Sequence, residues 1–372
     1  MKVGDRIEIQ IDRLSYDGGR GVGRLNDFVF FVAGTSPDEL VEADIVELKK
    51  NFGVAKLRRL VRAGPSRRKA PCPVYDSCGG CVWQHISYPE QITQKQNQLA
   101  FALKKVLPPE MANPKIISSP NEFRYRNRVQ LHVSGEKIGF FAAGTNDLVE
   151  INDCLIADER LFKGLNWRAP EFKSGRKVEI ALDNAGRRVL RNLSEEESVF
   201  SQVNTEQNEI LKRTVVDWAR STTPPKSIYD LYCGDGNLSF ALLAELPVER
   251  FTGVEFSSAA VARAKAKNQY GLGVQFRAQD VQAFLAKTRI LDPETLIVAD
   301  PPRAGLGSQV CADLLRLRPD HIIYVSCNLS TLARDLTALT ADYKVAALVG
   351  LDMFPQTEYI EAVVSLVPRA SR

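Results

Sequence analysis

The stretch SIYDLYCGDGNLSF, residues 227–240, decides the fold of the second half of the chain. It begins as a short apolar run, which predicts a buried strand, and its last residues begin a helical pattern. Gly234 and Gly236 lie at the turn between them, where the backbone must bend tightly and can approach a ligand. Glu255 ends the next apolar run, nineteen residues after Gly236. An acid at that distance can bind the two hydroxyls of a ribose.

Two ligands fit this turn. A dinucleotide fits the glycines and the acid. However, Ser239 stands at the third position of G-x-G-x-x-G, where a glycine would allow the helix to pack closely on the strand. S-adenosylmethionine also fits, since it has no pyrophosphate to cradle. Asp280 ends the third apolar run, at the same edge, and could bind an adenine amino group. The glycine pair by itself is weak evidence for a ligand, because an ordinary turn is the alternative.

Outward from this turn, residues 198–372 alternate short apolar runs with helical stretches, which predicts a parallel, doubly wound α/β sheet. The last two runs lie close together and predict an antiparallel pair. Asp300 ends the fourth run, Cys327 ends the fifth, and Glu361 lies near the start of the last. Open α/β sheets bind ligands at the carboxyl ends of their strands. A buried structural thiol is the alternative for Cys327.

Residues 1–62 predict a small β-barrel of the OB type. DRIEIQIDRL alternates apolar and polar side chains, SYDGGRGVGRLND is a glycine-rich turn, and DFVFFVAG and EADIVELKKN continue the strand pattern. Several short strands with glycine turns in so few residues are typical of such a barrel. OB barrels often bind single-stranded nucleic acid, although the fold alone does not establish that function.

Residues 63–197 predict a central α+β domain that begins with a cysteine segment. Cys72, Cys78 and Cys81 are spaced C-x5-C-x2-C. In a reducing compartment, cysteines indicate metal binding or catalysis before disulfides. Most cysteine metal sites use four ligands, so a fourth donor is expected elsewhere in the chain.

The stretch NEFRYRNRVQLHV, residues 121–133, predicts a strand of the same central domain. A period of two puts Arg124, Arg126 and Arg128 on one face of that strand. Three guanidiniums this close require an anionic partner or water. The face therefore predicts either an RNA contact or a solvated sheet surface.

Composition indicates the general class of the protein. The 372 residues are 44% hydrophobic and 25% charged, which is ordinary for a globular protein of two or three domains. We find no run of 18 apolar residues and no signal-peptide core, so we expect a cytoplasmic protein without a membrane span, and a monomer by default. The net charge of +4 is only a weak signal for nucleic acid.

Four motifs together resemble the S-adenosylmethionine-dependent RNA uracil-5-methyltransferases: DLYCGDGN, DPPRAG, SCNLSTLARD and DMFPQTEYIE. CPVYDSCGGC with a later cysteine resembles the iron–sulfur branch that methylates ribosomal RNA, and the first sixty residues resemble the TRAM domain. The C-terminal region is then expected to be a Rossmann-like class I methyltransferase domain. Two positions depart from the family pattern: Leu329 stands where a proline follows S-C-N, and Gln356 stands where a histidine precedes the threonine.

The resemblance implies roles for individual residues. Cys327 would add to carbon 6 of uracil, which makes carbon 5 nucleophilic, and Glu361 would later remove the proton from carbon 5. Cys154 would complete the ligands of a [4Fe–4S] cluster, which the resemblance favours over zinc. The implied cofactor-binding residues are Gln202, Tyr232, Gly234, Asn237, Glu255, Asp280 and Asp300.

The implied substrate is 23S ribosomal RNA, and the T-loop of transfer RNA is the alternative. A cytosine-5-methyltransferase is disfavoured, because Ser326 precedes Cys327 where those enzymes have a proline. A non-catalytic iron–sulfur protein that binds RNA is the alternative from another functional class.

Overall fold

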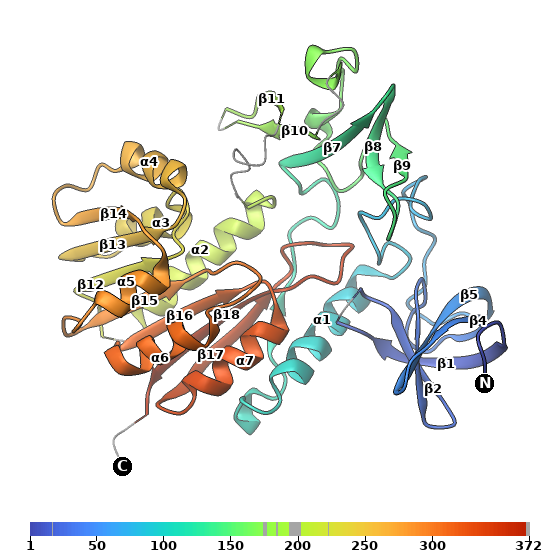
Figure 1. Cartoon of the computed structure of the whole chain (residues 1–372), viewed down its shortest axis with the longest axis horizontal. Coiled ribbons are helices and arrows are strands. Elements are labelled where there is room, and N and C mark those ends of the chain that lie inside the picture. The colour runs from blue at the N-terminus through green and yellow to red at the C-terminus, as the bar shows by residue number, and fades with distance from the viewer. Residues whose placement is uncertain (17, 174–176, 184, 193–201, 222, 370–372) are drawn as a thin grey trace.

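The computed structural model describes residues 1–16, 18–173, 177–183, 185–192, 202–221 and 223–369. The chain forms three units in sequence order: a small barrel, a five-stranded sheet, and a large α/β unit that ends with the C-terminus (Figure 1). The expected fold class is therefore confirmed. The expected boundary between residues 197 and 198 lies within 193–201, outside the described residues.

Five strands close the N-terminal barrel in the order β1-β2-β3-β5-β4. They are β1 (Arg6–Leu14), β2 (Gly21–Leu25), β3 (Phe28–Val32), β4 (Leu40–Leu48) and β5 (Phe52–Arg62). Alternate side chains of β1 point inward, and Ile7, Ile9 and Ile11 pack with Phe30 and Val41 inside the barrel. The alternation in the sequence therefore produces a closed sheet without a free edge.

Helix α1 (Tyr88–Leu103) lies between the barrel and the α/β unit (Figure 1). On the barrel side, the Gln94 side chain accepts a hydrogen bond from the Leu14 backbone N–H at 3.1 Å. The Gln98 amide donates to the Ser15 carbonyl at 3.0 Å. On the other side α1 packs against the α/β unit, so it couples the first and last domains.

The central sheet has the strand order β11-β10-β7-β8-β9. Its strands are β7 (Arg128–Ser134), β8 (Lys137–Phe141), β9 (Leu148–Glu150), β10 (Lys177–Leu182) and β11 (Arg188–Asn192), with the 3-10 turns η1 (Pro109–Met111), η2 (Glu159–Leu161) and η3 (Pro170–Lys173) nearby in sequence. The strand expected over 121–133 begins only at Arg128. Arg124 has a φ of 57°, which is left-handed and interrupts an extended segment.

The large sheet has the order β14-β13-β12-β15-β16-β18-β17-β6. Its strands are β6 (Lys115–Ile117), β12 (Ser227–Leu231), β13 (Arg250–Glu255), β14 (Val274–Ala278), β15 (Thr295–Ala299), β16 (His321–Ser326), β17 (Tyr343–Leu351) and β18 (Glu361–Pro368). Strands β12 to β16 pair in parallel, and β17 and β18 form the predicted antiparallel pair. Strand β6, from the central region, extends this sheet beside β17.

Helices cover both faces of the large sheet. They are α2 (Thr205–Arg220), α3 (Asn237–Glu245), α4 (Ser258–Lys267), α5 (Val281–Lys287), α6 (Gly307–Leu317) and α7 (Leu329–Leu339). Helices α2, α3 and α4 pack on one face, and α1, α5, α6 and α7 pack on the other. Every residue of β15 and β16 is consequently buried, as expected for parallel strands. In the described parts of the chain, no helix is both long and apolar enough to cross a bilayer.

Candidate functional site

The glycine turn after β12 leaves space for a ligand. Gly234 and Gly236 both have left-handed backbones, with φ of 57° and 96°. A Cβ on Gly236 would lie 2.3 Å from the Phe240 ring, whereas a Cβ on Gly234 would meet nothing within 4 Å. Glu255, the last residue of β13, accepts a hydrogen bond from the Gly234 N–H at 3.2 Å. The predicted ribose acid is therefore held against the open side of the turn.

The other predicted cofactor-binding residues have different surroundings. Tyr232 follows β12 with a φ of 63°. The Asn237 and Asn208 side-chain amides bond to each other at 2.9 Å. Asp280 follows β14 and caps α5, where it accepts from a backbone N–H at 2.8 Å. Gln202 lies just before α2 and does not follow a strand of the large sheet. Its contact with the cofactor stays a prediction.

The predicted nucleophile and base are neighbours on adjacent strands. Strand β16 pairs antiparallel with β18 so that Ser326 faces Ala362. The next residues outward are Cys327 and Glu361, which therefore lie side by side at the edge of the sheet. Asp300 follows β15, which flanks β16 on its other side. We call these three side chains, Cys327, Asp300 and Glu361, the thiol–carboxylate edge.

Burial controls the protonation of this edge. It raises the pKa of the Cys327 thiol to about 12, and the charges of Glu361 and Asp300 add to that effect. The Arg303 guanidinium acts in the opposite direction. Burial also raises the pKa of Asp300 to about 7. Burial and then the charge of Asp300 raise the pKa of Glu361 well above its usual range. Near neutral pH, the resting thiol is therefore protonated.

Two residues near the nucleophile were not predicted. Arg303 follows the two prolines after Asp300, and its guanidinium lies 5.0 Å from the centre of the Tyr359 ring. Its carbonyl accepts a hydrogen bond from the Asn328 side chain at 3.0 Å. Tyr16, from the barrel, lies against the start of α7. The DPPRAG motif already contained a signal for Arg303, but no local pattern indicates Tyr16.

Gln356 ties the base-bearing loop to the cysteine segment. This residue is fully buried and has a left-handed φ of 69°. Its carbonyl accepts hydrogen bonds from the Val82 and Trp83 backbone N–H groups at 3.0 and 3.1 Å. Its side chain accepts from Gln91 at 3.0 Å and from Arg68 at 3.1 Å. Gln356, which stands where the family pattern has a histidine, therefore has hydrogen-bond partners for its carbonyl and its side chain.

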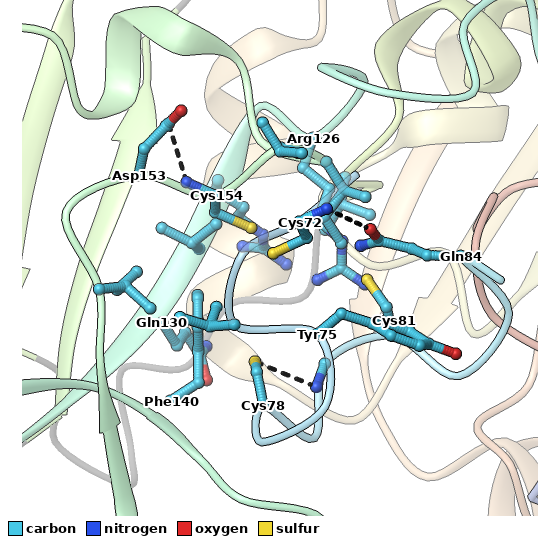
Figure 2. A pocket seen from close by; sticks show the side chains of 18 residues that line it. Cys72, Tyr75, Cys78, Cys81, Gln84, Arg126, Gln130, Phe140, Asp153 and Cys154 are labelled. Carbon is cyan, nitrogen blue, oxygen red and sulfur yellow. Dashed lines mark hydrogen bonds between the residues drawn. The ribbon is translucent and has the colours of Figure 1, made fainter. Parts of the chain in front are cut away.

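The four predicted metal-binding cysteines line one cavity of about 390 Å³. Cys72, Cys78, Cys81 and Cys154 turn their sulfurs towards its interior (Figure 2). We call this the four-cysteine pocket. Burial raises the pKa of Cys81 to about 12 and of Cys154 to about 11. Within the described residues, no three His, Cys, Asp or Glu side chains are placed to hold a single metal ion.

The three arginines expected on one strand face do not share a face. Arg124 pairs with Asp153 at 2.6 Å, beside the Cys154 carbonyl. Arg126 lines the four-cysteine pocket, and its buried Nε has no hydrogen-bond partner. Arg128 also lines the pocket and pairs with Glu179 at 3.4 Å. The expectation that the strand extends through Arg124 is therefore wrong, because it begins only at Arg128, and RNA contact by the three arginines stays a prediction.

Comparisons with known proteins agree along the whole chain. Residues 288–369 match the family described as tRNA (uracil-5-)-methyltransferase, residues 1–57 match the TRAM domain, and residues 228–292 match a methyltransferase domain. An uncharacterized RNA methyltransferase of Bdellovibrio bacteriovorus is 36% identical, over 98% of this chain and 95% of that protein. An uncharacterized RNA methyltransferase of Aquifex aeolicus is 29% identical, over 97% of this chain and 98% of that protein.

One solved structure matches the fold over nearly the full length. It is the crystal structure of the Pyrococcus abyssi tRNA (uracil-54, C5)-methyltransferase in complex with S-adenosyl-L-homocysteine. The TM-score is 0.73 at 22% identity, over 97% of this chain and all of that one. At this level of identity the match establishes the arrangement of the three units.

Proposed function

The chain belongs to the S-adenosylmethionine-dependent RNA uracil-5-methyltransferase family, and we propose that it methylates carbon 5 of a uridine in 23S ribosomal RNA. The observation that carries this proposal is the thiol–carboxylate edge. A sulfur nucleophile and a buried base lie on adjacent strands, next to a ligand-accepting glycine turn. A structural cysteine would not need an acid beside it, whereas methylation through a covalent adduct needs a nucleophile to form the adduct and a base to release it.

The chemistry begins with Cys327. Its sulfur adds to carbon 6 of the uracil, and the electron pair of the ring double bond makes carbon 5 a nucleophile. S-adenosylmethionine, when bound, would supply the methyl group to carbon 5 and leave as S-adenosylhomocysteine. The resting thiol has a raised pKa, so its proton must leave as substrate enters, and the neighbouring Asp300 carboxylate can accept it. The positive charge of Arg303 favours the Cys327 thiolate and therefore helps the thiol to lose its proton.

Glu361 completes the reaction. After transfer, carbon 5 carries both the methyl group and its original proton, and Cys327 is still bonded to carbon 6. Removal of that proton by the Glu361 carboxylate restores the double bond and expels the Cys327 thiolate. The raised pKa of Glu361 makes it a stronger base than an exposed glutamate.

The target uridine has to leave its stack to reach this edge. Carbon 6 can be attacked only from the face of the ring, which neighbouring bases cover in a folded RNA. The barrel contacts the start of α7 next to Cys327, so RNA held by the barrel would lie close to the nucleophile. This RNA substrate makes the cytoplasm the expected compartment.

The four-cysteine pocket fits an iron–sulfur cluster. In a [4Fe–4S] cluster each cysteine binds a different iron, so the sulfurs surround a volume and do not converge on one ion. In the structure, four cysteines line one cavity. The unpaired Nε of Arg126 matches an anionic group in the cavity. Cys72, Cys78, Cys81 and Cys154 would hold the cluster, which would join the cysteine segment to the central sheet.

The RNA target is the part of the proposal that experiment must decide. The resemblance of the cysteine segment to the ribosomal-RNA branch supports 23S RNA. The T-loop of transfer RNA is the second candidate, since the similar Pyrococcus abyssi structure is of a tRNA methyltransferase. Mapping 5-methyluridine in both RNAs from a deletion strain tests this. We expect one site to disappear from 23S RNA and to return with the wild-type gene but not with Cys327→Ala. Loss from transfer RNA alone would refute the ribosomal target.

A further inference from the structure

A loop of the barrel is fixed in place close to the nucleophile. The Ser15 N–H donates to the Arg20 carbonyl at 2.7 Å, and the Arg20 N–H donates to the Ser15 hydroxyl at 3.0 Å. Fully buried Trp83 donates its ring N–H to the Gly19 carbonyl at 2.9 Å. A Cβ on Gly19 would lie 2.6 Å from that ring nitrogen, so the loop packs tightly there. Ser15, Gly19 and Arg20, which are close to Tyr16 in sequence, are therefore held by these hydrogen bonds.

Tyr16 reaches the residues that follow Cys327. Its hydroxyl accepts a hydrogen bond from the Leu329 N–H at 2.8 Å and donates to the Asn328 side-chain oxygen at 3.3 Å. The Leu329 N–H is the first donor of α7, and such donors have no partner within their own helix. The Asn328 oxygen also caps α7 through the Ser330 N–H at 3.0 Å. One hydroxyl thus completes the helix start that immediately follows the nucleophile.

We propose that Tyr16 is a positioning residue for methyl transfer: by fixing Asn328 and Leu329, it holds the Cys327 sulfur beside Glu361. This inference rests on the proposed function of Cys327. It assigns the barrel a part in catalysis, in addition to any part in RNA binding. A nucleophile at the end of a strand needs such support, because a small displacement of a reacting atom lowers the rate strongly.

The departure at residue 329 agrees with this role. A proline there would have no N–H, and its ring would fix its own φ. Leu329 keeps the N–H, and Tyr16 is the group that accepts it. Asn328 has φ and ψ of −138° and 106°, a conformation that a following proline allows. Leu329→Pro would therefore fit the Asn328 backbone, but it would remove the donor and a buried leucine side chain and would place the proline ring against the Tyr16 hydroxyl.

The test removes one oxygen atom. Tyr16→Phe keeps the ring, so we expect the protein to fold, the KM for RNA to stay within about twofold, and kcat to fall about tenfold. Tyr343→Phe is the matched control, because that buried hydroxyl donates to the Pro319 carbonyl at 2.8 Å, ahead of β16 and away from the edge. We expect its kcat to stay within about twofold of wild type.

A second readout needs no RNA. The rate at which iodoacetamide alkylates Cys327, followed by peptide mass spectrometry, should rise about threefold in Tyr16→Phe because the loosened turn exposes the sulfur.

The positioning role is overturned if Tyr16→Phe leaves both kcat and alkylation of Cys327 within about twofold of wild type. It is equally overturned if Tyr343→Phe lowers kcat as much as Tyr16→Phe does. A wild-type protein that methylates no uridine would instead refute the proposed function, and the alkylation rates would still decide whether Tyr16 positions the thiol.

Discussion

The thiol–carboxylate edge and the four-cysteine pocket use the same residue type for two different purposes. Burial raises the pKa of Cys327 and of Cys81 alike, to about 12 in each case. Both sites have an arginine nearby, but Cys327 lies beside two carboxylates, whereas the pocket cysteines face one another. Carboxylates can move protons, and a guanidinium favours anionic sulfur. The neighbouring carboxylates, more than burial, therefore distinguish the proposed nucleophile from the predicted metal-binding cysteines.

We expect the largest loss of methyl transfer when the nucleophile is removed, and this loss distinguishes the two cysteine sites. Cys327→Ala removes the nucleophile, so we expect methyl transfer to fall on the order of 10⁴-fold with folding and iron content unchanged. Cys154→Ala should do the reverse: iron is lost and Tm falls, while any folded protein keeps activity within about tenfold. Single-turnover methylation and iron analysis of both variants measure this. Equal activity losses in the two variants would mean that the sites are not distinct.

The next effect concerns the base. Glu361→Gln can no longer accept the carbon 5 proton, so we expect release of product to slow about 10³-fold while the covalent RNA adduct accumulates. In the wild type the base must be ionised, so the release rate should rise with pH and level off above the raised pKa of Glu361. Glu358→Gln, in the same loop, is the control. Quenched-flow gels resolve adduct from free RNA, and a variant that turns over without adduct would exclude Glu361 as the base.

The smallest expected effect concerns stability. Burial raises the pKa of Asp230, which lies under the glycine turn, to about 7. The folded state then binds this proton more tightly than the unfolded state does, so this contribution to stability is complete below about pH 4 and is lost as pH rises to about 7. Asp230→Asn should therefore increase the free energy of unfolding by about 3 kcal/mol at pH 8 and change it little at pH 4.

Urea unfolding at the two pH values measures this difference. Cys327→Ala is the comparison, since it leaves Asp230 unchanged. A gain at pH 4 that equals the gain at pH 8 would show that Asp230 does not carry the shifted proton.

The sequence predicted those site residues that come from strand ends. Glu255, Asp300, Cys327 and Glu361 each end or begin a short apolar run, and the topology of a doubly wound sheet brings such positions to one edge. Period-two reasoning also located the barrel core. These parts of the fold follow from local pattern because each strand is buried as a unit.

The other features of the site depend on backbone conformation and on contacts between distant residues, which no local sequence pattern encodes. The three arginines failed to share a face because Arg124 adopts a left-handed backbone, which alternation in the sequence does not reveal. Tyr16 and Leu329 are 313 positions apart and meet only because α1 holds the barrel against the α/β unit. Such contacts arise from domain packing and become visible only in three dimensions.

The most direct test of the account uses RNA that carries 5-fluorouridine. Fluorine replaces the proton that Glu361 removes, so the reaction stops after methyl transfer with the RNA still bonded to the protein. After digestion, mass spectrometry should find a methylated fluorouridine nucleotide on the peptide that contains Cys327, in a yield that requires S-adenosylmethionine. An adduct on Cys72, Cys78, Cys81 or Cys154, or methylated RNA without any adduct, would contradict the central claim.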